Sequence, residues 1–543
     1  MSDASPDFPV DWPFPGAEDL TWIRDAMHFP SPLTPLTVSF LREGLEHGVA
    51  AACEELQMPI STLRHTAFNG WVFNAAVPAG SPEEMGPRME RHGPLMVDHM
   101  DNLRRRWDEG YRADVERLTA ELDALDFTGT GDGAVAEFRR LVEISIAIWR
   151  IHFLIVLPKL GAGERFSAMY TEITGTTNEM EPYRCLMGEP NKTLETDREL
   201  KRLADDARAA PVVAAALLEE SAADALARLD ESAEGRAWRE RLDAFLDTYG
   251  QRAQLIELSS PTWQEEPSFV LENLHRFLTD DALDPEEHRQ RTVAEATALI
   301  DAARARVAGN PELSAAFDAA YAAARAAWPL EEDHAFYIDQ RSLAGATRRA
   351  FLRIAQAFTQ RGQIEIADDI WYLDFDAVRD GLEGAALVAR AQDGRRRFAD
   401  GARLEAPPLL GAPPDPDTPV DPGLVKFFGK PGPPEVEGQT LRGSAGSKGR
   451  IEGIARVVRT IDDLHRVQVG EILVCRSTTP PWTPIFGSIA ALVTDTGGVL
   501  AHGAIVAREY GIPAVMGTKI ATRMIQDGQR ITVDGDRGEV LVG

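Results

Sequence analysis

The chain has 543 residues, of which 44% are hydrophobic and 26% charged, and its formal net charge is -29 at pH 7. This length exceeds what one hydrophobic core supports, so we expect several domains in a soluble globular protein. A surface so acidic repels nucleic acids and anionic membranes, which excludes both as expected partners.

The first residues, MSDASPDFPVDWPFPG, are acidic and rich in proline. They lack the basic and apolar regions of a signal peptide, and nowhere in the chain do about 18 apolar residues run without interruption. The three cysteines, Cys53, Cys185 and Cys475, lie far apart and without the spacing of a metal site. We therefore expect a cytoplasmic protein without a transmembrane helix or a disulfide framework.

Residues 1–405 are predicted to form a large, mostly α-helical domain that binds a substrate. Segments rich in Ala, Leu, Glu and Arg, such as 212–231 and 293–309, carry apolar residues three and four positions apart. This spacing is typical of amphipathic helices. The segment 138–160 is more apolar and is expected to be a central buried helix.

Residues 406–440 are dense in proline and glycine and are predicted to be an extended, semi-rigid linker. Residues 441–543 then show short β-like runs separated by glycines, with one helix among them. The expected fold is therefore multidomain, with a large, mostly α-helical domain tethered to a small C-terminal α/β domain.

The segment ALVTDTGGVLAHGAIVAREYGIPAVMGT contains a strand, a turn at Gly497 and Gly498 that a side chain would not fit, and a helix that begins at His502. The free N–H groups and the dipole at a helix start favour an anion over an imidazolium. A neutral imidazole is a nucleophile, and its phosphorylated form is an anion that this helix start can hold. We predict His502 as a phosphoryl carrier, and the alternative is a histidine that only packs or binds water. The residues expected to support the phosphate are Gly497, Gly498, Thr494 and Arg508.

This segment resembles the mobile, swivelling domain of the phosphoenolpyruvate-utilising enzymes, a family that includes phosphoenolpyruvate synthase and pyruvate phosphate dikinase. The family motif is a glycine pair, a histidine and an alanine-rich helix that ends before a proline. The matching residues are Gly497, Gly498, His502, Ala504, Ile505, Ala507, Arg508 and Pro513. The resemblance implies that His502 is the phosphohistidine.

Two positions depart from the dikinases, because Leu500 and Ala501 stand where many of them carry threonine and then serine or threonine. A regulatory phosphothreonine is therefore not expected. The variant looks closer to rifampicin phosphotransferase, and segments 186–200, 245–267 and 348–378 also resemble that enzyme's substrate-binding domain. In the second of these segments, Gln251 replaces a histidine that often follows Tyr-Gly.

Such relatives begin with a nucleotide-binding ATP-grasp domain, whereas this sequence starts with residues that resemble the substrate domain. The run GSAGSKG is not a complete P-loop and precedes a strand. The resemblance thus implies that ATP and Mg²⁺ bind to a separate ATP-grasp subunit, as in phenylphosphate synthase with its separate histidine-bearing subunit. The signatures HEXXH and CxxC are absent, and we expect no metal site on this chain.

The segment EEDHAFYIDQR places His334, Asp339 and Arg341 close together. An alcohol-phosphorylating site needs a base for the hydroxyl proton and an arginine to steady the phosphoryl charge. We predict these three residues as contacts of the substrate or phosphoryl group, and the alternative is a helix start with solvated charges. His152, which flanks an apolar segment, is expected to be structural.

These features predict a phosphotransferase subunit that carries a phosphoryl group on His502. It would transfer this group from an ATP-grasp partner to a small organic alcohol or phenol, with the C-terminal domain swinging on its linker. The alternative is a phosphocarrier or regulatory subunit without acceptor chemistry of its own.

Overall fold

A computed structural model describes residues 8–253, 256–279, 284–414, 425–426, 428–430, 432–459, 461–478 and 480–543. Its internal contacts group the chain into two compact units. Unit 1 comprises Met1–Pro158, Leu255–Pro261 and His334–Pro419, and unit 2 comprises Lys159–Gln254, Thr262–Asp333 and Val420–Gly543. We describe each unit by itself.

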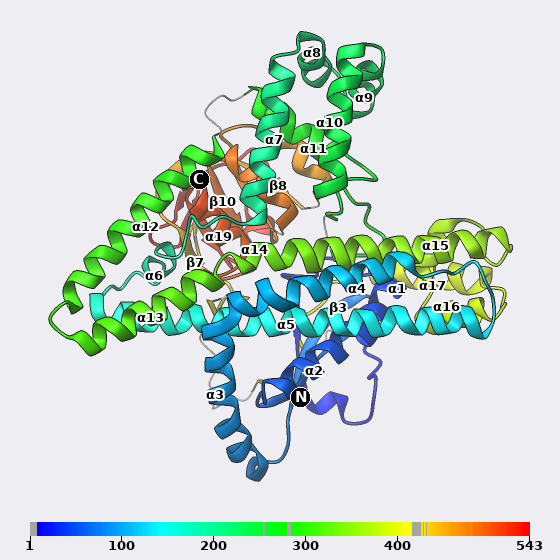
Figure 1. The fold of residues 1–543 in the computed structure, drawn as a ribbon, viewed down its shortest axis with the longest axis horizontal. Coiled ribbons are helices and arrows are strands. Elements are labelled where there is room, and N and C mark those ends of the chain that lie inside the picture. The colour runs from blue at the N-terminus through cyan, green and yellow to red at the C-terminus, as the bar shows by residue number, and fades with distance from the viewer. Residues whose placement is uncertain are drawn as a thin grey trace. The chain divides into compact units, whose positions relative to one another are not determined.

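Unit 1 is built mainly from helices, with one small antiparallel sheet of order β2-β3-β1-β4 (Figure 1). Its helices include α1 (Pro35–Phe40), α2 (Glu46–Glu55), α3 (Pro82–Arg106), α4 (Arg112–Ala124), α15 (Thr347–Gln360), α16 (Phe375–Leu382) and α17 (Val388–Gly401). Its strands are β1 (Thr21–Arg24), β2 (Ile60–Phe68), β3 (Trp71–Pro78) and β4 (Leu409–Gly411), and short 3-10 helices are η1 (Ala17–Asp19) and η5 (Ala367–Tyr372).

The predominance of helices confirms the fold class expected for residues 1–405, but the sheet was not predicted. The signal for it was the dipeptide Asn69–Gly70, which joins β2 to β3 with φ values of 53° and 85°. Positive φ at both central residues is what a two-residue hairpin turn requires, and Asn-Gly satisfies it. Aromatic side chains such as Trp22, Phe68 and Phe73 then fill the core over this sheet.

Three segments of unit 1 are π-helical rather than α-helical. They are η2 (Leu41–Leu45), η3 (Trp107–Tyr111) and η4 (Ala335–Ala346). The last has 12 residues. Because π-helices are rare and occur mostly as single turns at functional sites, such a long one marks a part of unit 1 to examine closely.

Helix α5 (Asp132–Thr174) has 43 residues and continues from unit 1 into unit 2. By length and composition alone it is long and apolar enough to cross a membrane. However, half of its most apolar window is buried inside the protein, as in the core helix of a soluble protein. The prediction of a central buried helix for residues 138–160 agrees with this burial.

Unit 2 combines a helical part with an α/β part. The helices are α6 (Glu181–Arg184), α7 (Lys192–Arg208), α8 (Pro211–Glu219), α9 (Ala222–Asp230), α10 (Ala233–Tyr249), α11 (Ser268–Thr279), α12 (Pro285–Val307), α13 (Pro311–Ala327), α14 (Leu330–His334), α19 (His502–Glu509) and α20 (Ala521–Met524). The strands are β5 (Glu435–Glu437), β6 (Thr440–Arg442), β7 (Ser444–Ser447), β8 (Arg450–Val458), β9 (Ile472–Cys475), β10 (Ala491–Thr494), β11 (Ala514–Met516), β12 (Arg530–Asp534) and β13 (Glu539–Val542).

The nine strands form one sheet of order β5-β6-β13-β12-β8-β9-β10-β11-β7, with η6 (Ile461–Arg466) and η7 (Pro480–Gly487) in its connections. Strands β8 to β11 are parallel to one another. Valine, isoleucine and alanine side chains bury one face of this sheet, which confirms the predicted C-terminal α/β region. Helix α19 starts beyond the carboxyl end of the parallel strand β10, which is the edge where ligands bind in open α/β sheets.

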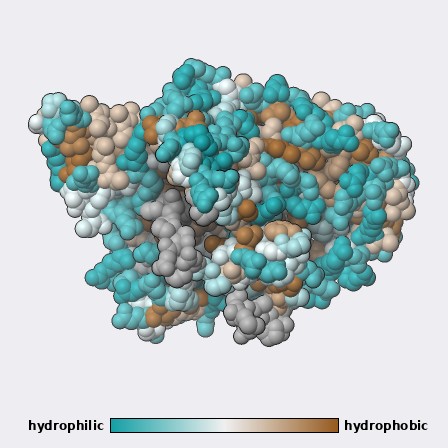
Figure 2. All heavy atoms as spheres, turned by 90° about the horizontal axis from the view of Figure 1, so that it is seen from below, coloured by the Kyte–Doolittle hydropathy of each residue, from teal (hydrophilic) through white to brown (hydrophobic). Residues whose placement is uncertain are grey.

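The predicted linker, residues 406–440, is only partly described, because residues 415–424 lie outside the described residues. Within it, β4 pairs with β1 of unit 1 and β5 pairs with β6 of unit 2. The domain boundaries at 405 and 440 stay a prediction. On the face shown in Figure 2, hydrophilic side chains predominate, in keeping with the acidic composition.

We predict that Gly48→Ala destabilises unit 1. A Cβ at Gly48 in α2 would lie 2.4 Å from the Cβ of Trp149 and 2.9 Å from the backbone nitrogen of Arg150, both in α5. Forcing a methyl group into such a contact costs about 1–3 kcal/mol, measurable as a lower midpoint of urea unfolding. The control is Gly133→Ala, where a Cβ meets nothing within 4 Å. Equal midpoints for the two variants would show that α2 does not pack this closely on α5.

Candidate functional site

The loop before α19 has a shape that only its glycines allow. Gly497 has φ 91°, in the left-handed region. A Cβ at Gly498 would lie 2.2 Å from the carbonyl oxygen of Lys426, and the same carbonyl accepts a hydrogen bond from the Leu500 N–H at 2.7 Å. The tight turn expected before the helix is thus present, and it sets His502 at the first position of α19.

The imidazole of His502 is half-buried, with Nδ1 3.3 Å from the hydroxyl oxygen of Thr478. Phe486 lies edge-on to the ring, with 6.2 Å between the ring centroids. Burial lowers the pKa of His502 from 6.5 to about 3, the nearby Glu331 carboxylate raises it and the Arg252 guanidinium lowers it further. His502 is therefore neutral near pH 7 and keeps a lone pair on one ring nitrogen.

Arg508 supports the loop rather than the imidazole. Its guanidinium is buried and donates hydrogen bonds to the carbonyl oxygens of Val499 at 2.7 Å and Gly446 at 2.9 Å. Burial lowers the pKa of Arg508 to about 9. Thr494 is also buried, and its hydroxyl donates to the carbonyl oxygen of Thr496 at 2.8 Å. Both residues, predicted as phosphate support, hold backbone that positions His502.

Two cations that the sequence analysis missed lie in the helical part of unit 2. Lys159 pairs with Glu331, and its Nζ lies 4.9 Å from the centroid of the Trp328 ring. Arg252 is buried and donates from Nη2 to the Thr196 hydroxyl at 2.7 Å. Glu331, which is the partner of Lys159, and Arg252 both act electrostatically on His502, so these two charges lie near the imidazole. A charged lysine at the end of the apolar run FLIVLPKL was the available signal.

Several buried carboxyl groups lie in or near α19, the helix that begins at His502. Burial raises the pKa of Asp197 to about 6, of Glu332 to about 7 and of Glu509 to about 8. The Tyr510 hydroxyl donates to Asp197, and the Thr193 hydroxyl donates to Glu332. These acids therefore carry less negative charge at pH 7 than exposed acids would. A phosphohistidine at His502 would meet correspondingly weak repulsion.

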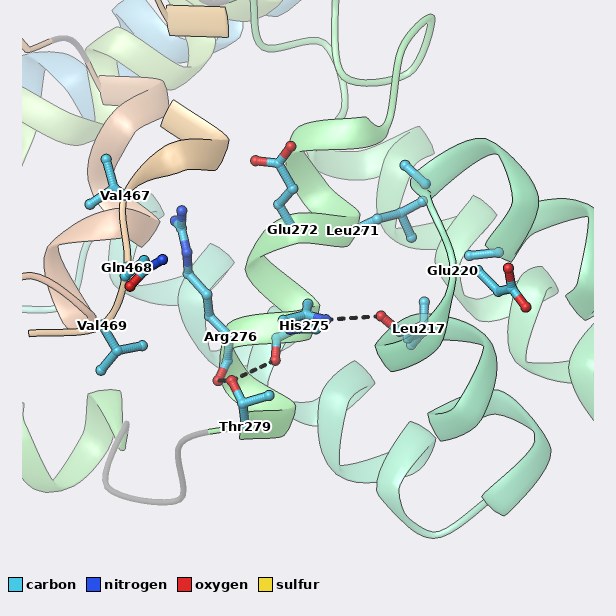
Figure 3. A pocket seen from close by; sticks show the side chains of 12 residues that line it. Leu217, Glu220, Leu271, Glu272, His275, Arg276, Thr279, Val467, Gln468 and Val469 are labelled. Carbon is cyan, nitrogen blue, oxygen red and sulfur yellow. Dashed lines mark hydrogen bonds between the residues drawn. The ribbon is translucent and has the colours of Figure 1, made fainter. Parts of the chain in front are cut away.

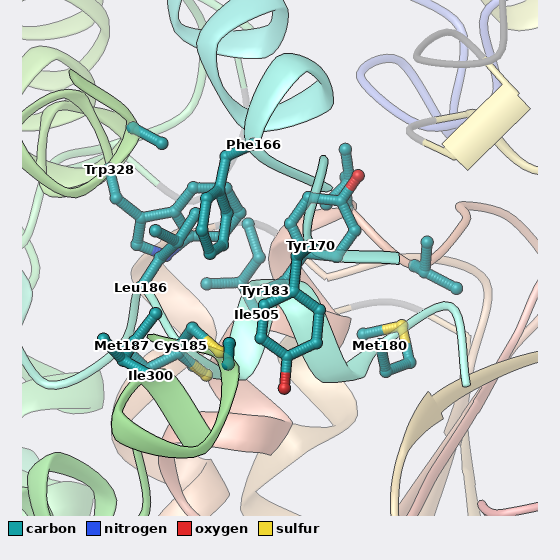
Figure 4. Close-up of a cluster of buried hydrophobic side chains, with 14 of the residues drawn as sticks. Phe166, Tyr170, Met180, Tyr183, Cys185, Leu186, Met187, Ile300, Trp328 and Ile505 are labelled. Atoms are coloured by element: carbon teal, nitrogen blue, oxygen red, sulfur yellow. The ribbon is translucent and has the colours of Figure 1, made fainter. Parts of the chain in front are cut away.

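An apolar cluster joins the loop and α19 to the helical part of unit 2 (Figure 4). Val499, Leu500 and Ile505 are all at most 4% exposed and belong to the same cluster as Phe166 and Trp328. Leu500, which stands at a threonine position of the dikinases, thus has a packing role here. The cluster packs the loop and α19, which flank and include His502, against the helical part of unit 2.

Two cavities of unit 2 lie apart from the imidazole contacts. One, of about 350 Å³, is lined by α11 and by Val467, Gln468 and Val469, and it includes none of the predicted site residues (Figure 3). The other, of about 260 Å³, is lined by cationic side chains that include Arg184, Lys448 and Arg508. Of these two cavities, only the second is lined by a predicted site residue, which is Arg508.

The predicted trio of unit 1 is only partly brought together. His334 Nε2 lies 3.7 Å from Asp339 Oδ2, whereas Arg341 is exposed. His152, expected to be structural, joins the pair instead, with its Nδ1 2.9 Å from Asp339 Oδ1. The arrangement is two imidazoles and a carboxylate, and the role predicted for these residues toward a substrate stays a prediction.

Comparison with known protein families finds a match in the α/β part of the chain. Residues 467–538 match the family described as PEP-utilising enzyme, mobile domain. Residues 160–332 match the rifampicin phosphotransferase fourth domain, and most of them belong to the helical part of unit 2. Both matches confirm the resemblance on which the sequence analysis rests.

Several curated proteins are similar over long stretches. Chondramide synthase cmdD of Chondromyces crocatus is 32% identical over 99% of this chain and 14% of its own length. The uncharacterized phosphotransferase YvkC of Bacillus subtilis is 29% identical over 96% of this chain and 62% of its own. A rifampicin phosphotransferase of Streptomyces sp is 34% identical over 64% of this chain and 40% of its own. The chain thus spans less than two thirds of each relative.

We predict that the His502 imidazole stays neutral as the pH falls from about 7 to about 5, because burial lowers its pKa to about 3. Nitrogen NMR of the folded protein should show no titration of this ring near the ordinary value of about 6.5. The same ring in urea-unfolded protein is the control and should titrate there. Since the unfolded state binds the proton first, this residue's contribution to stability declines as pH falls from 6.5 toward 3. A folded-state midpoint near 6.5 would contradict the burial.

Proposed function

We propose that this chain is a phosphotransferase component in which His502 takes a phosphoryl group from ATP and passes it to the hydroxyl of a small organic alcohol or phenol. The observation that carries the proposal is a neutral imidazole at a helix start of the mobile domain. Two of the relatives described above, which are named as phosphotransferases, support it.

The first half-reaction forms a nitrogen–phosphorus bond. The lone pair of a His502 ring nitrogen attacks a phosphorus of ATP, the bond from that phosphorus to a bridging oxygen breaks, and the remaining nucleotide leaves with the electron pair. Because Nδ1 contacts the Thr478 hydroxyl, we assign the attack to Nε2. The hydrogen then stays on Nδ1, which donates to Thr478. Thr478 is a positioning residue in this scheme, since it selects the tautomer.

The second half-reaction reverses these electron movements. An acceptor oxygen attacks phosphorus, the nitrogen–phosphorus bond breaks, and its electron pair returns to the ring of His502. The acceptor's hydroxyl proton passes to a general base. His334 and Asp339 stay our prediction for residues that contact the acceptor, with Arg341 as the residue that steadies the phosphoryl charge.

The groups around α19 would stabilise a phosphohistidine at His502. The backbone N–H groups in the first turn of a helix, together with its dipole, stabilise an anion there. Arg252 adds positive charge, and the raised pKa values of Glu332 and Glu509 limit repulsion. The site therefore favours the phosphorylated ring without holding the unphosphorylated ring as a cation.

ATP and Mg²⁺ bind, in this proposal, to a separate ATP-grasp subunit. The similarity to a segment of chondramide synthase cmdD favours the alternative of an accessory phosphocarrier module without acceptor chemistry. Turnover of an alcohol or phenol in the presence of the partner separates the two roles.

We predict that His502→Gln abolishes incorporation of a phosphoryl group, assayed with the partner subunit and with ATP labelled at both its β- and γ-phosphates. Thr478→Val should slow incorporation by roughly tenfold, because it removes the hydroxyl that orients the ring. Thr478→Ser keeps a hydroxyl and should incorporate the phosphoryl group at about the wild-type rate. The control is His275→Gln, whose imidazole contacts the carbonyl oxygen of Leu217. Unchanged labelling of His502→Gln would refute the carrier role, and equal rates for Val and Ser at 478 would refute the orienting role.

We also predict that the chain alone neither binds ATP tightly nor hydrolyses it. Calorimetry with Mg-ATP should show no heat of binding at concentrations where the mixture with the partner shows strong binding. Micromolar affinity of the isolated chain would place a nucleotide site on this protein and contradict the proposed division between subunits.

A further inference from the structure

We propose that His152, His334 and Asp339 form a binding site for a divalent transition-metal ion in unit 1. This proposal does not rest on phosphoryl transfer by His502, although His334 and Asp339 are also the residues expected to contact the acceptor. Each residue offers one ligand atom, and the three ligand atoms all lie within 4.8 Å of one another. The rings of His152 and His334 are 5.0 Å apart between centroids, so both imidazoles face the carboxylate from neighbouring positions.

The distances fit a coordination polyhedron. Zinc–ligand bonds of about 2.1 Å put two ligands about 3.4 Å apart in a tetrahedron and about 3.0 Å apart in an octahedron. His152 Nδ1 lies 2.9 Å from Asp339 Oδ1, and His334 Nε2 lies 3.7 Å from the other carboxylate oxygen, Oδ2. The two imidazoles thus flank the two oxygens of one carboxylate, and small side-chain rotations would bring ligand atoms that now lie within 4.8 Å of one another around one ion.

The backbone provides an independent reason to regard the cluster as a built site. His334 ends α14, and Asp339 lies five residues later inside the π-helix η4. Residues five apart are hydrogen-bonded partners in a π-helix but lie on different faces of an α-helix. The π-helical winding thus brings the second imidazole to the carboxylate, at the cost of the regular α-helix.

One side chain of the cluster is almost fully shielded from solvent, and the other two are partly exposed. The side chain of His334 is 5% exposed, those of His152 and Asp339 15% and 21%. Trp149 and Phe153 contact the His152 ring through their aromatic edges and faces, which orients it. An ion can reach the two more exposed ligands from solvent, and the buried imidazole then completes its coordination.

The donor set selects the class of metal. Two imidazoles and one carboxylate suit zinc and other first-row transition metals, whereas Mg²⁺ prefers oxygen ligands. The Mg²⁺ that accompanies ATP is therefore not the expected occupant. Three protein ligands also leave a position open for a water molecule or a substrate oxygen, which is typical of catalytic rather than structural zinc sites.

The test is metal binding by the full chain, stripped with a chelator and titrated with Zn²⁺ against a chromophoric competitor. We expect one tight equivalent for the wild type and no comparable binding of Mg²⁺. His152→Gln and Asp339→Asn should each weaken Zn²⁺ binding by roughly 100-fold or more, beyond the effect of losing an outer-shell partner. The matched control is His47→Gln, an exposed histidine of the same unit, which should bind as the wild type does.

Co²⁺ substitution provides a second measurement. The wild type and His47→Gln should show the same visible cobalt spectrum, and Asp339→Asn should lose it while keeping its thermal unfolding midpoint. Wild-type Zn²⁺ binding no tighter than that of His152→Gln, or an unchanged cobalt spectrum in Asp339→Asn, would overturn the site. Neither measurement involves phosphoryl transfer, so failure of the carrier proposal leaves this result unaffected.

Discussion

The His502 imidazole lies where a helix start, a group of buried ionisable side chains and an apolar cluster meet, and burial keeps the ring uncharged. Several contacts in unit 2 hold the backbone that surrounds this ring. Gly498 brings the loop against the Lys426 carbonyl, and Arg508 holds the carbonyls of Val499 and Gly446. Each contact fixes backbone that would otherwise leave the first turn of α19 open to water, where a histidine would take up a proton near neutral pH.

The location of the proposed carrier was predicted from the sequence because the features that indicate it are local. A glycine turn, a histidine at a helix start and a proline after the helix stand within a short run of residues. The neighbouring charges could not be read in this way, since Lys159 and Arg252 come from distant helices and only the packing of unit 2 places them. Arg508 illustrates the same limit: its position on the helix was evident, but the direction of its guanidinium was not.

Unit 1 shows a different limit of sequence reasoning. The Asn69–Gly70 hairpin carried a clear local signal that the dominant helical pattern obscured. The proximity of His334 to Asp339 was predicted from their spacing, but the third member, His152, lies far away in the sequence and joins them only through the packing of α5 on η4. Arg341 follows Asp339 by two residues and yet is exposed, because the winding of the backbone decides which side chains share a face.

The apolar cluster that holds the loop has a thermodynamic consequence for transfer between two sites. When the C-terminal domain swings on its linker, as expected from the sequence, it leaves the helical part of unit 2, and Val499, Leu500 and Ile505 then meet water. Exposing apolar surface raises the heat capacity, and the hydrophobic driving force for docking weakens on cooling. The undocked population should therefore grow at low temperature. A partner that presents its own apolar surface to the same three residues would offset this exposure. Recognition of the proposed nucleotide-binding subunit and release from the helical part would then involve the same face of the domain.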